Sequence, residues 1–404
     1  MGNNDRFVIE MHVGKLYGVG RMNCDSTGRN KDVMFNNKRY HRISSQSKKY
    51  AWRENMEEYF CEDKTYKTRH VCDLIEKRLE SCDSELLKNN ATDIAKTITE
   101  KIILDNNNDT KEKLKENNKT AQVIVITNHD VDDIISAINK NISDEKTLKQ
   151  LLDKNKNIIE TLKKEILSKL PMRKHSIECS LFGRMSTVGI MEPVESSVCV
   201  NHSYSLGKAK NDTDYFVVNE NYVAQNCDDI VVQNQGAGYL DSKDIAPGHV
   251  YYEYTSIDVT HFYENLCKGV DMTKEENKER VKKVLKDVVL FMVDAVLSAS
   301  PKGAQNAFAT SPLPVGALIR IRDKGQNLTA DNFCFQEMSK YDKTEEEKFY
   351  SAMNNFLKFS KSNYRHYLKD IFVTFSDDAV SDYGETMTML DAINNIGEMI
   401  DERF

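Results

Sequence analysis

A stretch without glycine constrains the fold of this chain more than any other feature of its sequence. It runs from Arg29 to Phe182, and the first proline, Pro171, lies close to its end. Glycine and proline interrupt regular structure most often, so a long stretch without them that is rich in Lys, Glu, Leu and Ile favours helices. Asparagine runs at 89–90, 106–108 and 117–118 mark the expected joints between these helices. We therefore expect an inserted helical domain over residues 61–171, closed by Pro171.

Strand patterns occur near both ends of the chain. Residues 7–13 alternate between two faces, as a strand with one face on a core does. The pair Asn36–Asn37 lies inside KDVMFNNKRYHRI, which predicts a hairpin or an extended loop. Short strand-like segments follow Ser176: IECSLFGRM, SSVCVNHSYSL, DYFVV, HVYYEYTSID and VGALIRIRD. Strands near both ends of the chain, interrupted by helices, predict an α+β fold.

Three further helices are expected in the second half of the chain. Residues 276–299 predict an amphipathic helix, and residues 341–370 and 385–401 predict two more. The inward side chains of the first helix are Val281, Val284, Leu285, Val288, Val289 and Met292. For TAQVIVIT, at 120–127, the pattern leaves helix and strand open.

A basic segment stands out on an acidic chain. The whole sequence has a net charge of −7, but between Asp5 and Arg53 eleven Lys and Arg residues stand against four acidic residues. Ser44 and Ser45 offer N-cap hydroxyls for a helix that runs to Arg53, and Ser45, Lys49 and Arg53 share one face of it. Lysines, arginines and the free amides of a helix N-terminus all bind phosphate groups. Composition alone leaves two interpretations about even: a polyanion site, or an ordinary solvated helix start.

Catalytic motifs are nearly absent. The sequence contains no P-loop, no G-x-G-x-x-G, no G-x-S-x-G and no H-E-x-x-H. Cys199 and His202 are three residues apart on a strand-like segment, where side chains point to opposite faces, so a half-buried cysteine and a surface histidine are the favoured interpretation. Asp25, among Arg21, Arg29 and Lys31, either holds Mg²⁺ beside a phosphodiester or braces its loop through a turn hydrogen bond. The second role is favoured.

The chain gives no sign of a membrane segment, a signal peptide or a cofactor. No run of apolar residues is long enough to span a bilayer, and the chain begins without the pattern of a secretory signal. Its nine cysteines are scattered and form no C-x-x-C pair, which favours reduced thiols over disulfides or a zinc cluster. A soluble cytoplasmic protein is expected.

Several segments, taken in order, resemble a known family. IEMHV, MNCDSTGRNK and FNNKRYHRISSQSKKYAWR are similar to the N-terminal signature of the CasC family, the backbone subunits of the type I-E CRISPR Cascade complex that bind CRISPR RNA. SLFGRM, TDYF, GAGYL and GHVYYEYTSID keep the family's order further along the chain. The resemblance covers most of the chain outside the helical stretch, and I-S-S-Q followed by G-R-M at this spacing is its most specific part.

The resemblance implies a shape like a right hand. An RRM-like (ferredoxin-like) palm is expected over residues 1–60 and 172–375, with the RNA-binding loop and helix in its first part. The helical domain at 61–171 corresponds to fingers, a hairpin within about 190–224 to a thumb, and residues 376–404 to a C-terminal helical segment. Several copies are expected to stack along one CRISPR RNA, with each thumb folding over the guide of its neighbour.

The basic segment and the resemblance together give the expected RNA-binding positions. A guide must be held by its phosphates while its base edges stay free for pairing, so charged groups and amides are suited to this role. Met185 of G-R-M is expected to prop bases apart, as apolar wedges do; from the sequence alone, a core position is the favoured interpretation of a methionine. The expected residues are Arg21, Asn23, Arg29, Lys31, Arg42, Ser44, Ser45, Gln46, Lys48, Lys49, Arg53, Gly183, Arg184 and Met185.

Five positions depart from the family pattern. Cys24 and Tyr50 replace arginines, Asn36–Asn37 replaces a glycine pair, and Glu253 replaces another arginine. Arg21 and Lys48 are candidates to compensate for the missing arginines. Glu253 is a candidate for a subunit interface.

These observations predict a non-catalytic RNA-binding scaffold rather than an enzyme. Its expected partners are CRISPR RNA, target DNA through the guide, neighbouring copies of itself and other Cascade subunits. Two alternatives stay open. One is a metal-dependent ribonuclease that cuts target RNA through Asp25, and the other is a monomeric RNA-binding protein without regular spacing on RNA.

Overall fold

The computed structural model describes residues 6–56, 59, 63–104, 114, 116–186, 188–218, 238–301, 303, 305–374 and 385–404. The chain divides into two compact units, and each is discontinuous in sequence. The first, called the sheet unit below, comprises Met1–Asn55, Cys199–Ile257 and Leu290–Arg403. The second, called the helical unit, comprises Met56–Val198 and Asp258–Val289, together with Phe404.

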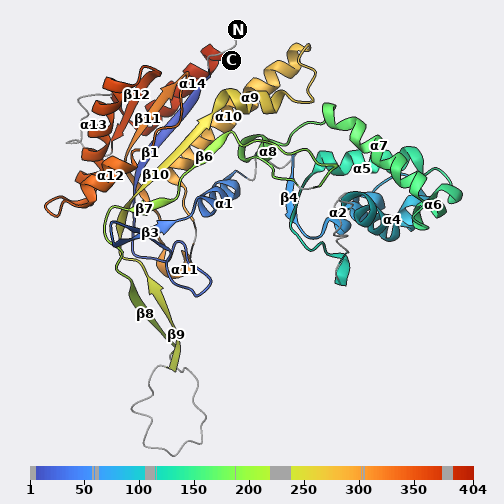
Figure 1. The fold of residues 1–404 in the computed structure, drawn as a ribbon, viewed down its shortest axis with the longest axis horizontal. Helices are drawn as coiled ribbons and strands as arrows, with labels where there is room; N and C mark the ends of the chain where they lie inside the picture. Colours follow the sequence, from blue (N-terminus) through green and yellow to red (C-terminus); the bar gives the residue numbers. More distant parts are fainter. Residues whose placement is uncertain are drawn as a thin grey trace, which may run out of the picture. The chain divides into compact units, whose positions relative to one another are not determined.

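A mixed sheet of nine strands, counted within the described residues, forms the sheet unit (Figure 1). Strand β1 pairs antiparallel with β11, with Val8 opposite Arg322, so the first strand of the chain lies inside the sheet. The path from edge to edge is β13 (Glu385–Met387), β12 (Tyr367–Thr374), β11 (Leu313–Arg322), β1 (Val8–Tyr17), β10 (His249–Asp258), β7 (Ser203–Ser205), β3 (Lys38–Ile43) and β2 (Asp32–Phe35), and β6 (Val198–Val200) pairs with β10 off this path.

The core of the sheet unit lies between the strands and two helices, α12 (Asp331–Met338) and α13 (Glu345–Asn363), which lie beside the sheet in Figure 1. Helix α13 begins with a capping box, in which Thr344 and Glu347 satisfy each other's backbone amides. Its Phe349 packs so closely on β1 that a Cβ on Gly14 would come within 2.9 Å of the ring. Glycine at this position therefore permits the helix to contact the sheet.

The hairpin and helix predicted around the basic segment are confirmed. Strands β2 and β3 pair antiparallel, and Asn36 and Asn37 turn between them with positive φ angles of 46° and 58°. Helix α1 (Ser45–Asn55) follows and buries Ala51 and Trp52. Burial of these two apolar side chains packs one face of the helix against the protein, while its other faces are mostly polar.

A second hairpin extends from the sheet unit in Figure 1. It pairs β8 (Asp212–Val218) with β9 (Gly238–Ile245) in an antiparallel register. The predicted thumb range of about 190–224 contains β8, whereas β9 lies beyond it. Residues 219–237, which include the first two residues of GAGYL, lie outside the described residues.

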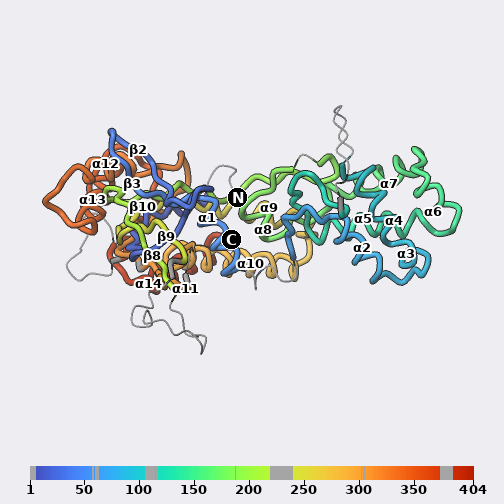
Figure 2. Tube along the Cα trace, turned by 90° about the horizontal axis from the view of Figure 1, so that it is seen from below, coloured from blue at the N-terminus to red at the C-terminus, as the bar shows by residue number. Residues whose placement is uncertain are grey.

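The helical unit has its own core, built by the helices of the glycine-free stretch, which gather around one another in Figure 2. The joint predicted at Asn89–Asn90 separates α3 from α4. Asn117 and Asn118, the third predicted joint, adopt left-handed angles in a 3-10 turn that is followed by strand β5. Residues 106–108 lie outside the described residues. The elements are β4 (Thr65–Thr68), α2 (Val71–Glu80), α3 (Glu85–Asn89), α4 (Ala91–Ile98), a π-helical turn (Thr99–Ile103), a 3-10 turn (Glu116–Asn118), β5 (Ile124–Thr127), α5 (Asn128–Asn141), α6 (Glu145–Leu152), α7 (Lys156–Lys169), a 3-10 turn (Leu170–Met172), α8 (Ile177–Phe182) and α9 (Val259–Cys267).

The prediction of a strand at IECSLFGRM is wrong. Its first part forms α8, capped by Ser176, whose hydroxyl accepts a hydrogen bond from the Cys179 amide at 3.1 Å. In the sequence, the apolar residues of IECSL alternate with Glu178 and Ser180, which is the period of a strand. The helix buries residues 178–182 throughout, so the polar side chains do not mark an exposed face. TAQVIVIT, which the pattern left open, contains strand β5.

The three helices predicted in the second half of the chain are present, but their ends differ from the predicted ones. Helix α10 (Glu275–Ser298) forms as expected and spans the border between the two units; α11 (Gln305–Phe308) is a single turn. The helix predicted over 341–370 ends at Asn363, and Tyr367 begins β12 instead. The helix predicted over 385–401 is preceded by β13 and forms α14 (Met389–Arg403). In the described part of the chain, no helix is both long and apolar enough to cross a membrane.

Replacement of Trp52 by alanine should destabilise the sheet unit by about 3–5 kcal/mol, because it removes a large, fully buried side chain and leaves a cavity. Tyr50→Ala on the same helix should cost less than about 1 kcal/mol, since Tyr50 is exposed. Urea unfolding followed by circular dichroism measures both. Equal losses in the two variants would contradict the packing of α1 described above.

Candidate nucleic-acid interface

The loop that precedes β2 is held by its own side chains. Oδ1 of Asp25 accepts hydrogen bonds from the Thr27 amide at 2.8 Å, the Thr27 hydroxyl at 2.7 Å and the Arg29 amide at 3.1 Å. The hydroxyl of Thr27, with the two amides, lowers the pKa of the Asp25 carboxyl below its ordinary value. Asp25 thus has the turn-bracing role that the sequence favoured.

Arg21 also braces this loop. Its guanidinium donates to Sγ of Cys24 at 3.1 Å and to the Gly28 carbonyl at 2.5 Å. Gly28 has a φ of +84°, and a Cβ there would come within 2.7 Å of the guanidinium. The guanidinium that was expected to compensate for the arginine missing at position 24 is therefore engaged inside the loop, while the side chain of Arg29 is exposed.

The N-terminus of α1 is tied to the loop and to the strand region beside it. The Ser44 amide donates to Oδ1 of Asn23 at 3.1 Å, and the Ser44 hydroxyl accepts from the Ser47 amide at 3.3 Å, as an N-cap does. The Ser45 amide donates to Nδ1 of His202 at 3.1 Å. Ser44 and Asn23 thus position the helix start, while Gln46 is exposed beside it.

Basic side chains surround this helix start. The Arg42 amide donates to the Lys31 carbonyl at 2.8 Å, and both residues line a crevice of about 10 Å³ with Asn23. Burial lowers the pKa of His202, and the positive charges of Arg42, Lys48 and Lys31 lower it further. A lowered pKa favours the neutral imidazole, the form in which Nδ1 of His202 can accept this hydrogen bond. The structure therefore brings Lys31 and Arg42 together at the start of α1.

The exposed face of α1 carries two more cations. Lys49 and Arg53 are half-buried and lie four residues apart, on the same face as Ser45. Both also make contacts within the protein. Tyr50, which replaces an arginine of the family pattern, is exposed, and a hydrogen bond with Glu54 raises the pKa of its hydroxyl.

Lys48 does not face the surface. Its side chain is only 2% exposed, with Nζ 3.9 Å from Oε2 of Glu253 and 3.4 Å from Oδ1 of Asn201. Burial lowers the pKa of Lys48 to about 8, although Glu253 acts in the opposite direction. The sequence predicted an RNA contact for Lys48, and the structure instead places it beneath the helix. Local sequence carried no signal of this, because its partner lies more than 200 residues away.

Glu253 lies inside the sheet unit, so its assignment to a subunit interface is wrong. Its carboxylate is 1% exposed, accepts a hydrogen bond from the Tyr17 hydroxyl at 2.8 Å and lies 3.6 Å from Nζ of Lys15. Burial acts to raise the pKa of Glu253, but Lys15, Lys48 and the Tyr17 hydroxyl outweigh it and lower the pKa. One buried carboxylate is thus the shared ionic partner of two buried lysines.

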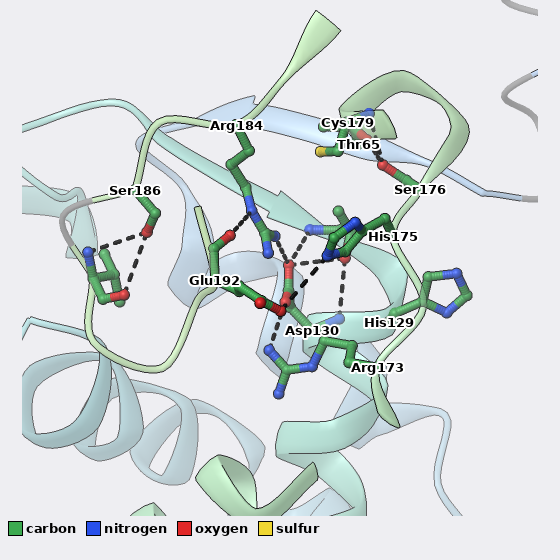
Figure 3. Close-up of polar contacts among 12 residues, drawn as sticks. Thr65, His129, Asp130, Arg173, His175, Ser176, Cys179, Arg184, Ser186 and Glu192 are labelled. Atoms are coloured by element: carbon green, nitrogen blue, oxygen red, sulfur yellow. Dashed lines mark hydrogen bonds and ion pairs between the residues drawn. The ribbon is translucent and has the colours of Figure 1, made fainter. Parts of the chain in front are cut away.

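The G-R-M segment lies in the helical unit, where Gly183 follows α8. Gly183 has a φ of +78°, and a Cβ there would lie 2.9 Å from two backbone atoms. Arg184 turns inward: its guanidinium donates to Oδ2 of Asp130 at 2.5 Å and to the Glu192 carbonyl at 2.8 Å. Arg173 reaches the other oxygen of Asp130 from a different side (Figure 3). Arg184 was predicted to bind RNA, and its side chain is buried in this cluster instead.

Met185 is the most exposed large apolar side chain among the described residues, at 92%. The core position that the sequence favoured for it is therefore wrong. Arg184, the residue before Met185, is buried and exchanges backbone hydrogen bonds with Val194. An apolar side chain held out from a braced loop is suited to insertion between flat groups.

Sequence reasoning missed two residues of this interface. His202 was interpreted as a surface histidine, and the structure shows it exposed but in contact with the first amide of α1. Asn201 links Lys48 to the Tyr254 amide. Cys199, interpreted as half-buried, is exposed. Among the described residues, no group of three His, Cys, Asp or Glu side chains is placed to hold a metal ion.

The protein has an α+β fold, and basic side chains surround the N-terminus of helix α1 in its sheet unit. The chain belongs to the CT1975-like protein family, whose model matches residues 9–402. Its fold is similar to that of a chain in a "CRISPR RNA-guided surveillance complex, pre-nicking", with a TM-score of 0.73 and 18% identity over 98% of this chain and 100% of that chain. A chain of a "CRISPR RNA-guided surveillance complex" matches with a TM-score of 0.65 and 17% identity, over 97% and 99% of the two chains. No curated protein sequence matches the chain.

Replacement of Glu253 by glutamine should destabilise the sheet unit by about 3–5 kcal/mol at pH 7, because Lys15 and Lys48 lose their buried counter-charge. The fluorescence of Trp52, the only tryptophan, reports the unfolding in urea. A Glu253→Gln, Lys48→Met double variant should recover part of the loss, since one buried charge is then removed with its partner.

The pH dependence of stability gives an independent check of the pairing between Lys48 and Glu253. The folded protein holds the Lys48 proton less tightly than the unfolded chain does, since its pKa is about 8 instead of 10.5. The contribution of Lys48 to stability therefore rises as pH increases between these values. Without Glu253 the pKa of Lys48 in the folded protein falls further, so the part of the loss in Glu253→Gln that is due to Lys48 should shrink as pH rises toward about 8. A loss that is independent of pH would contradict the pairing.

Proposed function

We propose that this protein is a non-catalytic RNA-binding scaffold that oligomerises along a CRISPR RNA and presents the guide for pairing with target DNA. The observation that carries the proposal is the cluster at the start of α1, where Lys31 and Arg42 lie at the positive end of the helix dipole. The amides of Ser44, Ser45 and Ser47 are bonded within the protein, so the two cations carry most of the proposed contact. The cluster is a group of phosphate-binding elements without a pocket for a base. The titles of the structurally similar chains, which name RNA-guided surveillance complexes, support the same proposal.

The chemistry of a guide explains why such a surface suits it. A guide must be held through its phosphates, because its base edges are needed for pairing with the target. Lysine and arginine side chains neutralise phosphates without regard to sequence, and serine and amide groups add hydrogen bonds. In this proposal Lys31, Arg42, Lys49 and Arg53 contact the guide backbone, and Ser45 and Gln46 add polar contacts.

The remaining parts have roles in the same proposal. The sheet unit acts as an RRM-like palm of the CasC type, the helical unit as fingers, and the β8–β9 hairpin as a thumb over the guide of a neighbouring copy. The base of this hairpin joins the basic loop, since Gly20 and Ala246 exchange backbone hydrogen bonds of 3.1 and 2.8 Å. Met185 separates adjacent bases, as apolar wedges do in other nucleic-acid complexes. Other Cascade subunits complete the assembly.

A ribonuclease that acts through Asp25 is the second candidate function. Asp25 is exposed in a loop with Arg29 and Lys31, so a phosphodiester has access to it. Three hydrogen bonds converge on Oδ1 of Asp25, however, and this oxygen is already satisfied by its own loop. The scaffold role is therefore the favoured one.

The double variant Lys49→Glu, Arg53→Glu should lose most of the RNA that co-purifies with the protein when it is expressed with a CRISPR RNA. Two negative charges on the exposed face of α1 would repel the guide backbone. The ratio of absorbance at 260 and 280 nm and the length of extracted RNA measure the loss. Lys282→Glu, Lys283→Glu on α10 makes the same change in charge in the helical unit and should retain the RNA.

Unchanged RNA in the α1 variant would contradict the assigned face. The third interpretation, a monomeric RNA-binding protein, predicts bound RNA without regular spacing of subunits. Footprinting of the bound RNA with a nuclease distinguishes the two, because a filament protects the guide at a constant interval.

The protein assembled with guide should leave a complementary RNA intact in the presence of Mg²⁺. Periodic cuts in that RNA, abolished by Asp25→Ala, would establish the ribonuclease and reject the scaffold. Asp25→Asn serves as a control, since it retains an oxygen that accepts the turn hydrogen bonds but removes the negative charge. A turn-bracing role predicts a larger drop in melting temperature for Asp25→Ala than for Asp25→Asn.

A further inference from the structure

An exposed tyrosine with two lysines lies on the sheet unit, away from the start of α1. Tyr341 is in the connection between α12 and α13 and is 72% exposed. Nζ of Lys38 donates a hydrogen bond to its hydroxyl at 3.1 Å, and Nζ of Lys208 lies 4.8 Å from the ring centroid. The three residues come from separate segments of the chain, so tertiary structure brings them together.

Other contacts fix the two segments that carry Lys208 and Tyr341. The Ala209 amide donates to the Arg39 carbonyl at 2.8 Å, which holds Lys208 beside the start of β3. Lys343 pairs with Glu337 at 3.2 Å, and the capping box of α13 closes the connection at Thr344. Because these contacts already stabilise both segments, Tyr341 is not needed to hold them.

The ring stays exposed to solvent although both lysines lie close to it. Nζ of Lys208 lies over the ring, 4.8 Å from its centroid, while Nζ of Lys38 is 3.1 Å from the phenol oxygen and 5.6 Å from the centroid. Hydrogen bonds from Lys38 and Lys208 lower the pKa of Tyr341. The result is an aromatic surface in solvent, with two ammonium groups close to it.

This combination matches the chemistry of one nucleotide. Bases of any sequence stack on aromatic rings, and lysines neutralise the adjoining phosphate. We propose that Tyr341, Lys38 and Lys208 form a second contact for single-stranded nucleic acid, in which a base stacks on the ring and its phosphate meets the two ammonium groups. The inference rests on the proposed function, since it adds a second point on the same strand-binding protein.

The second contact is separate from the first. Lys38 and Arg42 lie at opposite ends of β3, which places them about 13 Å apart along the strand. A strand bound at the helix start would therefore need more than one nucleotide to reach Tyr341. The guide and a target strand share the required chemistry, and the experiment separates these two sources.

The first arm measures binding of the full chain to a labelled single-stranded DNA and to an RNA of the same sequence. Tyr341→Ala should weaken both by roughly five- to a hundredfold, the range that loss of one stacked base gives. Tyr341→Phe keeps the ring and should retain most of the affinity. Tyr364→Ala removes another exposed tyrosine, at the end of α13, and should have no effect.

Salt dependence tests the lysines independently of the ring. Loss of one neutralised phosphate should reduce the slope of log K against log salt by about 0.7 for a single strand. Lys38→Ala, Lys208→Ala should show this change, whereas Tyr341→Ala should leave the slope unchanged. Wild-type affinity and slope in all these variants would overturn the proposal.

The second arm uses the complex assembled on a guide and compares wild type with Tyr341→Ala. Loss of co-purifying guide identifies the guide as the stacked strand, and loss of target-strand affinity with guide retained identifies the target. If neither changes, the contact does not exist in the complex and the proposal is overturned. Failure of the proposed function would appear differently, as a wild-type protein that carries no guide.

Discussion

Beneath helix α1, one carboxylate faces two ammonium groups with no access to solvent. Glu253 in β10 meets Lys15 from the neighbouring strand β1 and Lys48 from the helix, so three elements converge on it. Removal of one partner from such a group leaves an uncompensated buried charge, which is costly. The position of α1 on the sheet unit therefore depends on a charge balance as well as on the packing of Trp52.

This balance also decides which cations are available to a ligand. Lys48 is used inside the protein, and Arg21 is used inside its loop, so neither contributes an unengaged charge to the surface. Lys31 and Arg42 are left beside the amides of the helix start. Lys48 and Arg21 thus stabilise the candidate interface from inside, whereas Lys31 and Arg42 are partly exposed.

Local patterns were sufficient for some parts of the fold and not for others. Strand β1, the Asn36–Asn37 hairpin and α1 followed from alternation, turn residues and N-cap serines, all of which act over a few residues. Helix α8 was mistaken for a strand, because its apolar and polar residues alternate although both kinds are buried. Lys48 and Arg184 were mistaken for surface cations, since burial of a charge depends on a partner distant in sequence, Glu253 or Asp130.

Met185 is a position where the sequence pattern and the contacts in the structure must be considered together. A single exposed apolar side chain is ordinary and needs no explanation by itself. Here the residues before it are constrained: Gly183 has a backbone angle that other residues rarely adopt, and Arg184 is fixed by a buried carboxylate and two backbone hydrogen bonds. A loop that is rigid up to the residue before Met185 presents the methionine in one direction. These contacts of the preceding residues support the wedge role proposed for Met185.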